Sequence, residues 1–232
     1  MRAHELDGPV RSIAVTSPLV LSVQVGRARS HQTYPMSGRP AREWTSAIVK
    51  SAVEGRRAVG VLGVEGDEQA DRQNHGGPDK AVLAYSAENL ATWTDLLGAV
   101  PNGGFGENLT ISGQDESTVC LGDRYRIGDV LVECTQPRQP CWKLDERWSC
   151  RGLSTRALHT GRTGWYFRVL EPGTVGAGDR VELVDRPHPA WPLVRVARIM
   201  HRMEHDPRAE AELATLPQLA AAWRDRLLAR IA

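Results

Sequence analysis

Cys141 is the residue of this chain whose neighbours are best suited to chemistry. It lies three residues after Arg138 and two before Lys143, in the run 135–144, Thr-Gln-Pro-Arg-Gln-Pro-Cys-Trp-Lys-Leu. Nearby cations favour the thiolate, the form of cysteine that attacks electrophiles and binds metals. The two prolines each fix φ and remove an N–H donor, which favours a rigid loop over a helix or a central strand. We therefore expect a reactive or metal-binding thiolate here, rather than the buried small hydrophobe that free cysteine often is.

A second candidate is the polar, glycine-rich segment 66–80. Its paired glycines, Gly76 and Gly77, let the backbone approach a ligand closely and present N–H groups to an anion. Arg72 and Lys80 could supply charge to a phosphate, and His75 could donate to a phosphate or an oxo group. The spacing matches neither a P-loop nor a dinucleotide fingerprint, so a solvated turn is the alternative.

Two further motifs have ordinary alternatives. Asn108 follows Phe-Gly-Glu, and its amide could read the edge of a heterocycle or satisfy the backbone of a turn. His201, Glu204 and His205 match the H-x-x-E-H pattern of inverted zinc peptidases. The match is short and lacks an evident third ligand. Histidines on the surface of an amphipathic helix are therefore the better interpretation.

The composition is that of an ordinary globular protein. The chain has 232 residues, 41% hydrophobic and 25% charged, with a net charge of +1, so no overall field favours nucleic acid. Its four cysteines are too few for a disulfide scaffold, and none forms a C-x-x-C pair. The N-terminus does not resemble a signal peptide, and the apolar stretch 19–25 is too short to cross a bilayer. We expect a cytoplasmic protein that binds neither nucleic acid nor membrane.

Short apolar runs separated by Gly and Pro dominate the first four-fifths of the chain. This pattern, with few helices, predicts a barrel or a sandwich of strands. Ser86 fits an N-cap for a short helix over 89–97 that ends at Gly98, and 26–42 reads as a loop. The predicted strands are 18–25, 47–53, 58–64, 81–85, 108–111, 125–127, 130–135, 163–170 and 179–184.

The composition changes after the Pro-rich segment 187–192. Leu219, Trp223, Leu227 and Ile231 recur every fourth residue, which places them on one helix face. Thr215 and Pro217 are the expected start of this helix. We predict helices near 194–205, 208–215 and 218–231, and hence two domains, 1–187 and 188–232. The helical segment could serve dimerisation, partner docking or stability.

The segments HGGPDKAVLAY, FGENL and TQPRQPCWKL, in this order, resemble the MOSC domain, which is named for the C-terminal domain of molybdenum-cofactor sulfurase. The resemblance spans about residues 20–232 and is nearest to the YiiM-like proteins, whose C-terminal "3-alpha" domain the last segment resembles. It implies a mainly β (α+β) fold, a MOSC-type β-barrel with short helices followed by a small three-helix domain. It also implies a bound molybdenum cofactor (molybdopterin).

Carried over residue by residue, the resemblance makes Cys141 the molybdenum ligand and a catalytic residue, together with Arg138 and His75. A soft thiolate suits molybdenum, and a pterin phosphate needs cationic and backbone donors. The segment 44–50 resembles a family W-x-S-x-I-x-K motif, although the residues after it depart from the expected Pro-Val-x-Gly. The implied cofactor-binding residues are Ser46, Lys50, Arg72, His75, Gly76, Gly77, Lys80, Asn108, Arg138 and Lys143.

The activity implied is an oxidoreductase that removes oxygen from a small N-hydroxylated substrate, without pyridoxal phosphate. The chain shows no dinucleotide, haem or iron–sulfur motif, so its electrons would come from a separate reductase. Two alternatives stay open. Cys141 could carry a persulfide and deliver sulfur, or the protein could be a non-catalytic carrier of the molybdenum cofactor.

Overall fold

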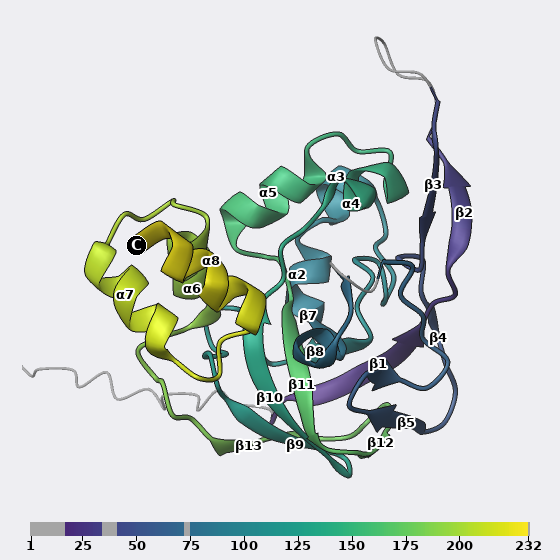
Figure 1. Ribbon diagram of the computed structural model, residues 1–232. Coiled ribbons are helices and arrows are strands. Elements are labelled where there is room, and N and C mark those ends of the chain that lie inside the picture. The colour runs from purple at the N-terminus through teal and green to yellow at the C-terminus, as the bar shows by residue number, and fades with distance from the viewer. Residues whose placement is uncertain (1–16, 34–40, 72–74, 232) are drawn as a thin grey trace, which may run out of the picture.

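A mixed eight-stranded sheet forms the centre of the molecule in the computed structural model, which describes residues 17–33, 41–71 and 75–231 (Figure 1). The strands are ordered β13-β9-β10-β11-β7-β8-β1-β4, and of these ladders only β7 with β8 is parallel. They are β1 (Leu19–Val25), β4 (Ser51–Ala52), β7 (Val82–Ser86), β8 (Leu109–Ser112), β9 (Arg124–Ile127), β10 (Val130–Pro137), β11 (Trp165–Glu171) and β13 (Val181–Asp185).

Two small sheets accompany the large one. The strands β12 (Gly173–Val175), β5 (Arg57–Gly60) and β6 (Gly63–Val64) form one of them. The other pairs β2 (Arg29–Gln32) with β3 (Glu43–Ser46), and it projects from the body as an arm (Figure 1).

The large sheet is not closed into the barrel that the resemblance implied. β13 and β4 lie at its two edges. The N-terminal end of β1 does reach the chain just before β13, where Val20 N donates to Asp179 O at 2.9 Å and Leu19 bridges Arg180. Beyond that point β1 pairs with β8 through a register shift, and β4 contributes only two residues. The ladder is therefore interrupted between β1 and β13, although the mainly β architecture is confirmed.

Most predicted strands are present, but the predictions differ from the structure around residues 26–53. The segment 26–42, predicted as a loop, contains β2, whose exposed polar residues have no apolar alternation. Of the predicted strand 47–53 only Ser51–Ala52 pairs in a sheet; the backbone of Ile48 is bonded instead to the side chains of Ser46 and Arg147.

The helices that flank the sheet are shorter than expected. Ser86 caps its helix as predicted, since its Oγ accepts from Asn89 N at 3.3 Å, but the segment 89–97 is split into two helices. Two helices in the region 142–160 were not predicted. The flanking helices are η1 (Pro78–Lys80), α2 (Ala87–Ala91), α3 (Thr94–Leu97), α4 (Trp142–Arg147) and α5 (Leu153–Thr160).

Three helices follow the last strand and pack beside β10, where Figure 1 shows them in yellow. They are α6 (Leu193–Met200), α7 (Pro207–Thr215) and α8 (Ala221–Ile231). Of the predicted apolar face, Leu219, Trp223 and Leu227 are buried, whereas Ile231 is exposed. The prediction that Thr215 and Pro217 begin the last helix is wrong: α8 begins at residue 221, where Asp79 accepts from Ala221 N at 2.9 Å.

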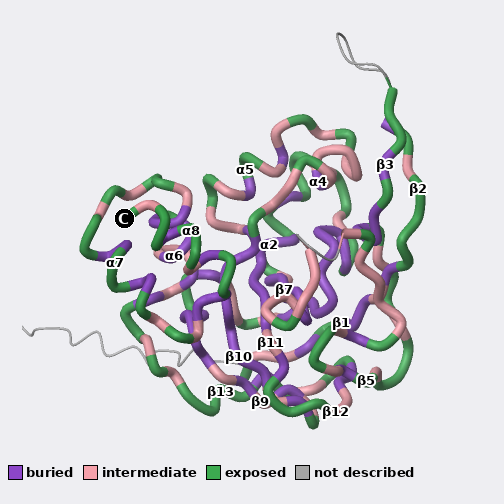
Figure 2. Tube along the Cα trace, in the orientation of Figure 1, coloured by how far each residue is buried: buried purple, intermediate pink, exposed green. Residues whose placement is uncertain are grey.

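The interior contains two apolar clusters, seen as the buried stretches of the trace in Figure 2. The larger cluster runs without interruption from the sheet into α6, α7 and α8. The smaller one lies among α2, α4 and α5 and includes Tyr85, Phe105 and Leu144. Among the described residues, no helix is both long and apolar enough to cross a membrane.

Candidate functional site

The two segments singled out from the sequence meet at one cleft. Its enclosed part measures about 80 Å³, room for several water molecules, and it opens to solvent. The residues around it come from the ends of β3, β7 and β10 and from the loops between them. They are Ser46, Ala47, Ile48, Lys50, Asp67, Glu68, Gln69, Ala70, Asp71, His75, Lys80, Leu83, Gly106, Asn108, Arg138, Cys141, Lys143 and Tyr166.

Cys141 lies in this cleft, half-buried, immediately before the first turn of α4. Burial by itself would raise the pKa of its thiol. A hydrogen bond from the His75 side chain, the charge of Arg138 and the backbone N–H of Lys143 oppose this effect, and together they bring the pKa below its ordinary value. The sulfur is therefore biased toward the thiolate. The His75 ring also faces a carboxylate, since its Nδ1 lies 3.5 Å from Asp71 Oδ2.

The run that leads to Cys141 is extended for longer than predicted. β10 continues to Pro137, which pairs with Trp165 of β11. A proline is tolerated there because β9 pairs with β10 only as far as Glu133, so no partner strand needs the missing N–H. The rigid loop is thus confined to residues 138–141, and α4 begins at Trp142.

Arg138 is held by a backbone carbonyl of Phe105, a residue of the smaller apolar cluster. Its Nη1 donates to Phe105 O at 2.6 Å, and only 6% of the residue is exposed. Phe105 is fixed in turn by stacking on Tyr85, with ring centroids 4.7 Å apart. A buried guanidinium keeps its charge, so this contact sets a permanent cation beside Cys141.

Asp67 organises the other side of the cleft and was not identified from the sequence. Its Oδ2 accepts from Lys50 Nζ at 2.6 Å and from Asn108 Nδ2 at 2.9 Å, and Oδ1 accepts from Gly26 N at 2.7 Å. Burial lowers the pKa of Lys50, against the opposing effect of Asp67. The segment 66–80 gives no sign in its sequence that Asp67 differs from its polar neighbours. Lys50 and Asp67 form an ion pair only because the fold brings the residue before β4 next to the loop after β6.

Asn108 lines the cleft, but its amide is used within the protein. Oδ1 accepts from Leu83 N at 3.1 Å, while Nδ2 donates to Gln24 O as well as to Asp67. This side chain thus joins β7 to β1 and holds Asp67. Of the two roles considered for it, the structure shows the second, the satisfaction of backbone groups.

The helix α4 holds the segment 45–48 against the cleft. Lys143 Nζ donates to Thr45 O at 2.9 Å, and Arg147 Nη1 donates to Ile48 O. Ser46 lies between these contacts, and its Oγ accepts from Ile48 N at 3.1 Å. Lys143 therefore supplies its backbone N–H to the thiol, while its ammonium binds a carbonyl on β3.

Eight of the predicted site residues are brought together here. Gly76 and Gly77 lie in the turn after His75 and are not among the residues around the cleft; Gly77 has φ 93° and immediately precedes η1. Arg72 lies outside the described residues. The eight residues in the cleft are Ser46, Lys50, His75, Lys80, Asn108, Arg138, Cys141 and Lys143.

An aromatic cluster lies beside the cleft, where the arm meets α4. The Trp142 ring, 39% exposed, contacts Trp44 edge to face at 5.5 Å, and Arg42 covers it at 3.8 Å. His31 stacks on Trp44 with centroids 4.4 Å apart. The cluster fastens the arm to the helix that follows Cys141.

The H-x-x-E-H motif has a structural role. His201 follows the end of α6 and packs edge to face on Trp223, with ring centroids 5.9 Å apart. Burial, with the charges of Arg226 and Arg230, lowers its pKa. Within the described part of the chain, no three His, Cys, Asp or Glu side chains are grouped to hold a metal ion. The sequence predicted surface histidines on a helix, whereas His201 lies just past the end of α6 and is half-buried.

Comparison with known proteins places this cleft in a family. The model of the MOSC domain matches residues 71–182, and that of the YiiM-like, 3-alpha helix domain matches 191–232. YflK of Bacillus subtilis (strain 168) is 36% identical over 217 residues, which cover 90% of this chain and 96% of YflK. A protein named Reductase from Gibberella moniliformis (strain M3125 / FGSC 7600) is 35% identical over 86% of this chain, which spans only 35% of that relative.

The fold agrees with these matches. The crystal structure of YiiM from Geobacillus stearothermophilus superposes with a TM-score of 0.77 at 33% identity, covering 93% of this chain and 100% of that one. The chain therefore belongs to the MOSC domain family and carries the C-terminal 3-alpha helix domain of the YiiM-like proteins.

Proposed function

We propose that this protein is an oxidoreductase that holds a molybdenum cofactor through Cys141 and reduces small N-hydroxylated compounds. The observation that carries the proposal is the half-buried thiol at the cleft, kept toward the thiolate by His75 and Arg138. MOSC membership supports the cofactor, and a relative named Reductase supports a reductive activity.

The donor set of the cleft fits such a group. A soft thiolate suits molybdenum, and the cations Arg138 and Lys50 suit an anionic pterin. The cleft offers about 80 Å³ to water-sized groups and opens to solvent, so it could admit the metal end of the cofactor. The other proposed contacts are Ser46, His75, Lys80 and Lys143 at the cleft, with the N–H groups of Gly76 and Gly77 beside it. Asn108 would contribute indirectly, by holding Asp67.

Reduction of an N–OH group to N–H consumes two electrons and two protons and releases water. When bound, the cofactor would supply the two electrons at its metal. His75 is placed to deliver a proton to the departing oxygen, since its ring contacts Cys141 and Nδ1 faces Asp71. The fixed charge of Arg138 would stabilise negative charge that develops on that oxygen. The electrons would come from a separate reductase.

Metal content tests the first part of the proposal. The protein is made in a host that synthesises the cofactor, as wild type, Cys141→Ala and Cys150→Ala. Cys150 is the matched control because it is the other half-buried cysteine. We expect about one molybdenum and one pterin per chain in the wild type and in the control. Molybdenum should be lost in Cys141→Ala. Absence of molybdenum from the wild type and the control would contradict the proposal.

Turnover tests the second part. With a reduced viologen as artificial electron donor, the loaded protein should convert an amidoxime to the amidine, or a hydroxylamine to the amine, and Cys141→Ala should not. A loaded protein without turnover would be a cofactor carrier.

Sulfur transfer is the second candidate, because a thiol biased toward the thiolate and partly open to solvent could also carry a persulfide. In that case the wild type would lack molybdenum, and intact-mass analysis would find one added sulfur atom on Cys141.

A further inference from the structure

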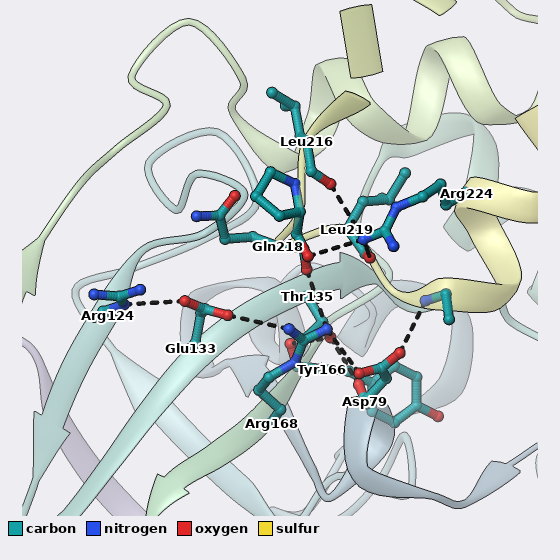
Figure 3. A network of polar contacts seen from close by, with 12 residues as sticks. Asp79, Arg124, Glu133, Thr135, Tyr166, Arg168, Leu216, Gln218, Leu219 and Arg224 are labelled. Atoms are coloured by element: carbon teal, nitrogen blue, oxygen red, sulfur yellow. Dashed lines mark hydrogen bonds and ion pairs between the residues drawn. The ribbon is translucent and has the colours of Figure 1, made fainter. Parts of the chain in front are cut away.

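The helix α8 contacts the loop that carries His75. The carboxylate of Asp79 accepts from Ala221 N, the first residue of α8, at 2.9 Å, and from Arg168 Nη2 of β11 at 2.7 Å (Figure 3). The backbone is tied as well, because Thr135 Oγ1 of β10 donates to Asp79 O at 2.7 Å. Asp79 is thus bonded to three elements that are distant from it in sequence.

The same helix also reaches the loop that carries Cys141. Arg226 Nη1, on α8, lies 3.5 Å from Gln139 Oε1, two residues before the cysteine. Burial, and to a lesser extent the charge of Arg226, lower the pKa of Lys80 in the cleft. One helix of the C-terminal domain therefore lies against both loops of the site.

The chain between His75 and Asp79 consists of Gly76, Gly77 and Pro78. Glycine reaches many backbone conformations, so the two glycines by themselves do not fix where His75 lies relative to η1. His75 N donates to Asp71 O at 2.9 Å on one side, and an anchor at Asp79 would hold the loop from the other side. Asp79 is the first residue after the stretch that is tied to the sheet.

The anchor is itself braced by partly buried charges (Figure 3). Arg168 Nη1 donates to Glu133 Oε1 at 3.3 Å, and Arg124 Nε donates to Glu133 Oε2 at 3.0 Å. Next to it, Ala220 N donates to Thr135 O at 3.2 Å. Partners on both sides limit how far the Asp79 carboxylate can move.

We propose that Asp79 is a positioning residue: by fastening the loop 75–80 to the start of α8 and to β11, it keeps His75 in contact with Cys141. The 3-alpha domain would then act on the site through its last helix. This role concerns only the contact between two side chains, so it stands or falls independently of the group that Cys141 binds.

Two variants weaken the anchor in different ways. Asp79→Asn keeps the shape but removes the charge that binds Arg168. Ala221→Pro removes only the N–H donated to Asp79, and proline is well tolerated at the first position of a helix. Asp179→Asn is the matched control. Asp179 likewise accepts from an arginine, Arg56 Nη1 at 2.9 Å, and from a backbone N–H, that of Gly176 at 2.8 Å, but it does not line the cleft.

The readout is the NMR signal of the His75 ring in protein labelled at histidine, assigned with His75→Gln. In the otherwise native protein, Cys141→Ala should shift this signal, because the two side chains are in contact. The same substitution should no longer shift it in the Asp79→Asn or Ala221→Pro background, but should still do so in Asp179→Asn. Thermal unfolding of each variant measures its stability. A loss of stability alone would not produce this pattern of shifts.

A shift that persists in both anchor variants would overturn the proposal. Failure of both to fold while Asp179→Asn folds would also overturn it, because Asp79 would then support the fold rather than the loop. If Asp79→Asn alone fails to fold, Ala221→Pro decides.

Discussion

At the scale of single residues, the reactivity of Cys141 depends on neighbours that compensate for its burial. Partial burial disfavours a thiolate, whereas His75 and Arg138 favour it, and the second effect is larger. Arg138 can play this part because Phe105 O holds its guanidinium in place at 2.6 Å. The cation is therefore fixed before any ligand arrives.

Removing that cation should raise the pH at which Cys141 reacts. In Arg138→Gln, the midpoint of the alkylation rate against pH should move up by about one unit, the usual effect of losing one nearby opposite charge. The rate is measured with iodoacetamide and resolved by peptide mass spectrometry. Lys143→Gln is the control, because its ammonium binds Thr45 O and its backbone N–H is retained. Equal midpoints in wild type and Arg138→Gln would contradict this view of the thiol.

The type and spacing of residues identified Cys141, Arg138 and His75 as candidates, since each has a recognisable chemical use, whereas Lys50 was a candidate only through the family resemblance. Asp67 could not be found in this way. Its importance lies in contacts with Lys50 and Asn108, 17 and 41 positions away, which only the folded sheet creates.

At the scale of elements, a buried carboxylate joins the start of β11 to α2. Glu116 accepts from Gly164 N at 2.5 Å and from Asn89 Nδ2 at 2.7 Å, with 3% of the residue exposed. Burial raises its pKa to about 7. Between its ordinary pKa of 4.5 and about 7, the folded protein binds more protons at this site than the unfolded chain does. Folding stability from this site therefore falls as pH rises through that window.

Glu116→Gln should remove this pH dependence. Gln has one acceptor oxygen, so the variant loses one of the two hydrogen bonds at every pH. Its stability relative to the wild type should nevertheless be up to about 3 kcal/mol greater at pH 8 than at pH 5, from about 1.4 kcal/mol per pKa unit. Denaturant unfolding at the two pH values measures the difference. Exposed Glu182→Gln serves as control. A difference that is the same at both pH values would rule out Glu116 as the source of the pH dependence.

The arm formed by β2 and β3 depends on a side chain of α4. Trp142→Ala removes the edge contact with Trp44 and the surface under Arg42, interactions of about 1 kcal/mol each. We expect faster hydrogen exchange in residues 29–32 and 43–46, with the sheet unchanged, and partial recovery in Trp142→Phe. Unchanged exchange in the arm would mean that the two-stranded pairing alone holds it.

Short apolar runs predicted β1, β7 and β10, whereas the elements that depend on tertiary contacts were missed. β2 has no apolar face and exists as the partner of β3. α4 follows a proline-rich run and is held by Lys143 and Arg147, which bind the backbone of 45–48. Neither β2 nor α4 has a local periodicity from which it could be predicted.

At the scale of the whole molecule, the two domains share one interior. The larger apolar cluster includes Val132 and Phe167 of the sheet together with Val196, Leu213 and Trp223 of the helices. The Pro-rich segment 187–192 correctly indicated a change of architecture. It could not indicate that the helices complete the core of the sheet, because that depends on which faces meet.

Deleting residues 188–232 should therefore destabilise the remaining chain strongly. Each large apolar side chain of the sheet that loses its cover forfeits roughly 1.5–3 kcal/mol, and several do so together. We expect the fragment 1–187 to lose cooperative thermal unfolding and to bind a hydrophobic dye. A fragment that unfolds cooperatively near the temperature of the full chain would show instead that the sheet has a sufficient core of its own.

The outer edge of β10 has a further consequence. Past Glu133 it has no partner strand, and its backbone groups are satisfied by residues 122–123 and by Ala220 N, which donates to Thr135 O. An uncovered strand edge is a template on which a second chain can add a strand. The turn before α8 thus also protects the folded protein against self-association, because Ala220 N occupies a carbonyl on this edge that a second chain could otherwise bind.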